Sequence, residues 1–232
     1  PGAENRHRPL SIFRLGRMMT MWWLAIVSAG ALAASPVLDQ YNDGVTTGGM
    51  AIANDIGEIQ TFTAGRSGML VRIDVEIWKG PRTTEALVLS IWSTDLMGLP
   101  ATQLAFQSFE AQSVSPMTTF LGWNLGSQAM LVSSGTQLAI VANSNARNDF
   151  PDFDERYEWG RVGSDTYAGG EAYYLRGSGY AALQEDLKFR TYVAAIPEPS
   201  QAALLVLGLC TLAATRPRAG KCSALQGDGR SD

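Results

Sequence analysis

The fold of this chain is decided by residues 70–79, Leu-Val-Arg-Ile-Asp-Val-Glu-Ile-Trp-Lys. One alternate set is apolar: Val71, Ile73, Val75 and Ile77. The other set is mostly charged: Arg72, Asp74, Glu76 and Trp78. A period of two residues places the two sets on opposite faces of an extended strand. The stretch therefore predicts a half-buried β-strand whose apolar face meets a core.

Similar short apolar or alternating runs occur along the middle of the chain. We expect further strands at residues 58–64, 86–93, 103–109, 118–125, 136–142, 157–161, 171–175 and 187–193. Turns rich in Gly, Pro and Ser separate these runs. No helical segment is long enough to form the crossover that joins two parallel strands. The sequence predicts an all-β body, an antiparallel β-sandwich or jelly-roll-like domain.

The charge and the rare residues of this body exclude several classes of function. Between Ala34 and Ala195 there are ten Lys/Arg and eighteen Asp/Glu, a net charge of −8. Such an acidic body argues against a nucleic-acid partner. His7, Cys210 and Cys222 all lie outside it, so it lacks Ser-His-Asp and Cys-His catalysis, His-ligated zinc and disulfides. We therefore expect a protein that is not an enzyme.

The N-terminal residues 1–33 have the composition of a basic extension followed by a signal peptide. Arg14 and Arg17 precede an apolar run that ends in small residues. Ala31 and Ala33 flank Leu32 as an A-x-A site for signal peptidase. We expect a signal helix that is cleaved, with residues 34–195 as an extracytoplasmic domain. The alternative is an uncleaved membrane anchor.

The C-terminal part combines a rigid motif, an apolar run and a basic cluster. Pro197, Glu198 and Pro199 form a short extended rod, because each proline fixes its own φ and extends the residue before it. The uncharged run 202–214 would rise about 20 Å as a helix, a marginal membrane span. The basic cluster then stops it: Arg216, Arg218 and Lys221. The alternatives are a buried helix or a plain tail anchor.

Residues 196–221 resemble the PEP-CTERM sorting signal of exported bacterial proteins. The resemblance implies that this chain is a substrate of an exosortase, a membrane-embedded transpeptidase that recognises the Pro-Glu-Pro motif. It departs from the family in its polar tail, residues 222–232. The body is similar to the β-sandwich bodies of "choice-of-anchor" exported proteins. Together these imply a surface- or matrix-associated protein of the cell envelope or exopolysaccharide, with transient or permanent anchoring in the inner membrane and a structural or adhesive role.

Two segments of the body are candidates for ligand binding. An acidic segment supplies oxygens of the kind that calcium prefers: Asp149, Asp152, Asp154 and Glu155. The same holds for a smaller group, Asp39, Asn42 and Asp43. The alternative is a pair of solvated loops. An aromatic segment could stack on sugar rings of a polysaccharide through Tyr157, Trp159, Tyr173 and Tyr174, as in a carbohydrate-binding module. The alternative is core packing.

Two carboxylates on the polar face of residues 70–79 allow a third hypothesis. Asp74 and Glu76 could act as the pair of a glycoside hydrolase, which needs no histidine. The alternative is that both belong to the solvated face of the sheet. We expect the solvated face.

Overall fold

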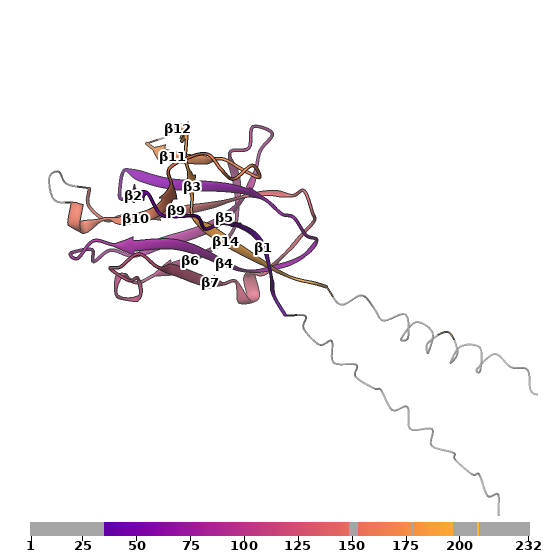
Figure 1. The fold of residues 1–232 in the computed structure, drawn as a ribbon. Helices are drawn as coiled ribbons and strands as arrows, with labels where there is room; N and C mark the ends of the chain where they lie inside the picture. Colours follow the sequence, from indigo (N-terminus) through magenta and orange to yellow (C-terminus); the bar gives the residue numbers. More distant parts are fainter. Residues whose placement is uncertain (1–34, 149–152, 178, 197–207, 209–232) are drawn as a thin grey trace, which may run out of the picture. The chain divides into compact units, whose positions relative to one another are not determined.

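The computed structural model describes residues 35–148, 153–177 and 179–196 together with residue 208. Within these ranges the fold is all-β and contains two antiparallel sheets (Figure 1). The expected signal helix and the C-terminal apolar helix fall outside the described residues. Among the residues described, no helix has both the length and the apolar character needed to cross a membrane.

The first sheet has eight strands and is built around one long strand, β4 (Gly68–Lys79). The neighbours of β4 along one edge are β7 (Phe120–Asn124) and β8 (Met130–Val132). Along its other edge lie β14 (Phe189–Ala194) and β10 (Tyr157–Val162). The remaining strands extend this side: β1 (Val37–Asn42), β2 (Gly48–Ile52) and β13 (Asp186–Leu187). The predicted stretch 70–79 is therefore the centre of the sheet.

The second sheet has six strands. Their order across the sheet is β12 (Gly179–Ala182), β11 (Ala172–Arg176), β3 (Ile56–Thr63), β9 (Gln137–Ser144), β5 (Leu87–Thr94) and β6 (Pro100–Phe109). Three 3-10 turns complete the described secondary structure: Ala111–Ser113, Gly126–Gln128 and Phe153–Glu155. Each strand predicted from the sequence is present. The predicted strand 187–193 is divided between β13 and β14, and four strands were missed: β1, β2, β8 and β12. Of these, β2 and β12 are rich in Gly and Ala, and β8 has only three residues.

The core lies between the two sheets and uses the apolar face predicted for β4. Ile73, Val75 and Ile77 are fully buried in it. The prediction for Val71 is wrong, since Leu70 takes the core position instead. The pairing with β14 skips Val71, because Tyr192 lies opposite Arg72 whereas the next residue, Val193, lies opposite Leu70. A β-bulge of this kind reverses which residues face the core.

Aromatic side chains join the two sheets across this core. Phe62 of β3 and Phe189 of β14 have ring centroids 5.9 Å apart. Tyr167 meets the ring of Phe189 edge-on at 5.0 Å. Such tilted and edge-on contacts are the arrangements that aromatic pairs prefer, so they fix the sheets against each other.

A side-chain amide covers the free edge of β6. Gln128 accepts a hydrogen bond from the backbone N–H of Phe106 at 3.0 Å and donates one to its carbonyl oxygen at 3.1 Å. The amide therefore occupies the two groups through which another strand would pair at this point.

The first and last strands of the body lie side by side (Figure 1). Val37, which begins β1, pairs with Val193 near the end of β14. Because the two strands are antiparallel, the chain enters and leaves the body at the same end of the sheet.

Candidate functional site

The outer face of the six-stranded sheet carries a small apolar cluster separate from the core. Ile59, Ala139 and Val141 are buried there, although no second sheet covers this face in the described structure. Three half-buried side chains cover them instead: Trp92 of β5 with Tyr173 and Leu175 of β11. We call Trp92, Tyr173 and Leu175 the aromatic strip.

The strip continues into a hollow at one end of the strands. The register pairs Leu175 with Gly57 and Val88 with Asn143, and the two pairs follow the pair Glu58–Ala142 at the same end of the sheet. A Cβ on Gly57 would lie 2.3 Å from Oδ1 of Asn143, so any side chain here would displace the amide. The missing side chain leaves room for a cavity of about 530 Å³, which we call the Gly57 pocket.

The walls of the Gly57 pocket combine amides with an apolar floor. Asn54, Asn143 and Asn145 line it, and each amide can both donate and accept hydrogen bonds. Asp55 and Arg176 also line it and face each other at 3.8 Å. Apolar area comes from Ile56, Val88 and Leu175. The pocket therefore offers neutral hydrogen-bonding groups over an apolar surface.

Carboxylates lie near the other end of the strip. Burial raises the pKa of Tyr173, and the nearby charges of Glu171 and Asp95 raise this pKa further. The carboxylate of Asp95 is held in place because it accepts the backbone N–H groups of Met97 at 2.8 Å and Leu99 at 3.0 Å. The hydroxyl end of Tyr173 therefore lies in an acidic environment.

A hydrogen bond within β5 fixes the ring of Trp92. Its indole N–H donates to the hydroxyl of Ser90 at 2.8 Å. Ser90 lies beside Val141 in the register, so the ring leans back over the apolar cluster. The sequence analysis did not identify Trp92 as a site residue, because residues 86–93 are apolar on both faces.

Of the four aromatic residues predicted to contact a glycan, the structure buries two and leaves two partly exposed. Tyr157 and Trp159 are fully buried, which corrects that half of the prediction. Both are held in the interior by hydrogen bonds to backbone carbonyls, from Tyr157 to Glu85 and from Trp159 to Lys188. Tyr173 and Tyr174 are half-buried on opposite faces of β11, and Tyr173 is the one that belongs to the strip.

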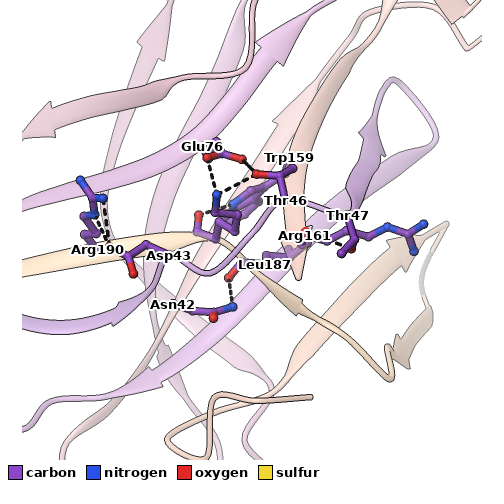
Figure 2. Close-up of polar contacts among 10 residues, drawn as sticks. Asn42, Asp43, Thr46, Thr47, Glu76, Trp159, Arg161, Leu187 and Arg190 are labelled. Carbon is purple, nitrogen blue, oxygen red and sulfur yellow. Dashed lines mark hydrogen bonds and ion pairs between the residues drawn. The ribbon is translucent and has the colours of Figure 1, made fainter. Parts of the chain in front are cut away.

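The two carboxylates considered for glycoside hydrolysis are buried in internal pairs. Glu76 is 6% exposed and accepts hydrogen bonds from the ammonium of Lys188 at 2.6 Å and the hydroxyl of Thr46 at 2.6 Å (Figure 2). Asp74 is 3% exposed and bonds Arg72 at 2.7 Å and Tyr192 at 3.0 Å. The expectation of a solvated face is therefore wrong.

The oxygen-rich group of Asp39, Asn42 and Asp43, in and just after β1, is also held by contacts within the fold. Asn42 donates to the carbonyl oxygen of Leu187 at 3.1 Å, and Asp43 pairs with Arg190 at 2.9 Å (Figure 2). Asp39 accepts the backbone N–H of Gly65 at 3.1 Å. The three side chains thus make separate contacts.

The predicted calcium segment is described only in part. Asp154 pairs with Arg82 at 3.8 Å, and Glu155 pairs with Arg147 at 3.7 Å. Asp149 and Asp152 lie outside the described residues. Within the described ranges, no group of three or more His, Cys, Asp or Glu side chains is placed to hold a metal ion.

The residues predicted for export and sorting also lie outside the described ranges. These are Ala31, Ala33, Pro197, Glu198, Pro199, Arg216, Arg218 and Lys221.

Comparison with known proteins adds little to this geometry. No protein-family model matches the sequence, and no curated protein matches it. Among solved structures, the crystal structure of the infectious bursal disease virus VP2 subviral particle is similar over 77% of this chain and 45% of that chain. The sequence identity is 11% and the TM-score is 0.22. A likeness at this level carries no argument about function.

Proposed function

We propose that this chain is an exported, non-catalytic protein of the cell envelope or exopolysaccharide matrix, with a structural or adhesive role. Signal peptidase would remove the N-terminal segment. An exosortase-type membrane transpeptidase would then act at Pro197–Pro199. The observation that carries the proposal is the pairing of β1 with β14, which brings both ends of the folded body to one end of the sheet.

This arrangement suits a body that is displayed on a tether. β14 ends at Ala194, shortly before the sorting motif. The turn that joins β3 to β4 lies at this same end, because Met69 pairs with Ala194. The Gly57 pocket lies at the opposite end of β3, roughly 20 Å along the strand. An attachment beyond Ala194 would therefore leave the pocket facing away from it.

The environment of the acidic side chains supports a non-catalytic body. A glycoside hydrolase needs one carboxyl group as an acid and another as a nucleophile or base, both beside the substrate. Asp74 and Glu76 are instead buried and engaged with Arg72, Tyr192, Lys188 and Thr46. Neither is available to a sugar in this arrangement.

The test is the mass of the mature protein recovered from the organism that encodes it, with its terminal peptides identified. We expect a chain that starts near Ala34 and ends near Pro197–Pro199. A Glu198→Ala variant should retain residues beyond the motif, whereas Thr102→Ala, an exposed position of β6, should be processed normally. A wild-type chain that remains intact through Asp232 would contradict the proposed sorting.

A further inference from the structure

We propose that the outer face of the six-stranded sheet binds a neutral polysaccharide, with Tyr173 and Trp92 stacking on sugar rings and the Gly57 pocket receiving one sugar unit. The proposal deepens the proposed adhesive function. It rests on that function only in assuming that the chain is exported to a place where polysaccharide is present. It is carried by the joining of an aromatic strip to an amide-lined pocket on one face.

The aromatic strip matches the amphipathic character of a sugar ring. One face of a pyranose is a surface of C–H groups, and its rim is a ring of hydroxyls. Tyr and Trp supply rigid apolar area with a polar group at the edge. Trp92 is held by Ser90, and Tyr173 rests on Ile59 and Val141, so both rings are ordered before a ligand arrives. Such preorganisation lowers the entropic cost of binding.

The Gly57 pocket supplies the hydrogen bonds that sugar hydroxyls need. A hydroxyl both donates and accepts, and so do the side-chain amides of Asn54, Asn143 and Asn145. The volume of about 530 Å³ lies within the range of pockets that bind small ligands. The pocket depends on Gly57, because a side chain there would collide with Asn143.

The charges around the strip favour a neutral ligand over an anionic one. Glu171 and Asp95 lie close enough to raise the pKa of Tyr173, and both repel phosphate, sulfate and uronate groups. The positive charge in the pocket, Arg176, lies opposite the carboxylate of Asp55. The net charge of −8 between Ala34 and Ala195 acts in the same direction.

The position of the strip also favours a sugar over a peptide strand. A peptide that binds to a sheet usually pairs with a free edge through its main chain. Here the backbone groups of β3 and β9 are already used within the sheet. From β11 to β5 the face is three strand spacings wide, or about 14 Å. This width accommodates a chain of several sugar units.

The test measures binding of the full chain, purified in detergent, to immobilised neutral and anionic polysaccharides. The neutral panel contains glucan, mannan, galactan and xylan, together with the neutral exopolysaccharide fraction of the organism. Alginate serves as the anionic probe. We expect saturable binding to at least one neutral polymer and weaker binding to alginate.

Two variants and two matched controls locate the site. Tyr173→Ala and Gly57→Ala should each reduce the affinity about tenfold or more. Tyr41→Ala removes a tyrosine that is 55% exposed on β1 of the other sheet, and Gly44→Ala adds a methyl group that meets only the side chain of Val162, at 3.4 Å. Both controls should bind within about twofold of wild type. Circular dichroism and thermal unfolding check that all four variants fold.

Three results would overturn the proposal. They are the absence of binding to every neutral polymer, equal affinity of Tyr173→Ala and Gly57→Ala with their controls, and preferential binding to alginate. Each is separate from the fate of the proposed sorting, which is read from the terminal peptides of the mature chain. The purified chain can bind although sorting fails, and a correctly sorted chain can fail to bind.

Discussion

Glu58 should make the stability of this protein fall as the pH rises through neutrality. The side chain lies within β3 and is 0% exposed, and neither of its carboxyl oxygens has a hydrogen-bond partner among the described residues. Its neighbours in the register are Ala142 and Tyr174. Burial raises the pKa of Glu58 to about 9, so the carboxyl group is protonated in the folded protein at neutral pH.

The magnitude follows from the difference in proton binding between the folded and unfolded states. Below pH 4.5, the ordinary value for Glu58, both states hold the proton. Between this value and about 9, the unfolded state releases the proton while the folded state keeps it. The free energy of unfolding therefore falls by about 1.4 kcal/mol per pH unit in this window. Between pH 4.5 and pH 7 the loss amounts to about 3 kcal/mol.

The assay is urea unfolding of wild type and Glu58→Gln at pH 5, 7 and 8. Glutamine does not titrate, so the variant should gain stability relative to wild type as the pH rises. The comparison uses the difference between the two proteins, because burial also raises the pKa of Glu171 and Asp186 in both. Glu110→Gln, at an exposed position, is the control. Parallel stability curves for wild type and Glu58→Gln would refute the reasoning.

Three further substitutions test other parts of the fold. Lys188→Met leaves the buried carboxylate of Glu76 without its cation and should lower the free energy of unfolding by about 3–5 kcal/mol. Adding Glu76→Gln should recover part of this loss in thermal unfolding. A double variant less stable than the single variant would contradict this. Gln128→Ala uncovers the free edge of β6 and should lower the free energy of unfolding by about 1 kcal/mol. Light scattering should also detect more oligomers than for wild type. An unchanged fraction of oligomers would count against protection of this edge by Gln128. Gly170→Ala places a Cβ 1.9 Å from the carbonyl oxygen of Thr61, so the urea midpoint should drop, and an unchanged midpoint would show that β11 shifts freely.

The strand at residues 70–79 could be predicted because its signal is local. Alternation of Ile73, Val75 and Ile77 with charged residues needs no knowledge of the rest of the chain. The exchange of Val71 for Leu70 in the core could not be predicted, since it follows from the register with β14. Registers between strands distant in sequence depend on the whole packed structure.

The burial of Asp74 and Glu76 was missed for a similar reason. Alternation correctly places them on the face away from the core, and such a face is usually solvated. Here Thr46, from the connection between β1 and β2, and Lys188, beside β14, converge on Glu76 from opposite ends of the body sequence. No local sequence pattern indicates that Thr46 and Lys188 cover Glu76.

The sequence predicted which kind of residue, aromatic, would form the candidate site, but not which aromatic residues would be exposed there. An aromatic segment near Tyr173 is visible in the sequence, but Tyr157 and Trp159 in the same segment belong to the buried core. Trp92 belongs to an apolar run that predicts burial. The importance of Gly57 depends on Asn143 from β9, so it becomes visible only in the folded sheet.

The place of β14 in the sheet has a mechanical consequence. β14 is paired along its length with β1 on one side and β4 on the other. If the body is attached beyond Ala194, traction from a polymer held at the far end loads β14 along its own axis. Hydrogen bonds between antiparallel strands run perpendicular to that axis. They would be sheared together on both flanks, whereas a load across the strand would peel them one by one. Resistance to pulling then depends on the rate of unfolding under force, which equilibrium stability does not set alone.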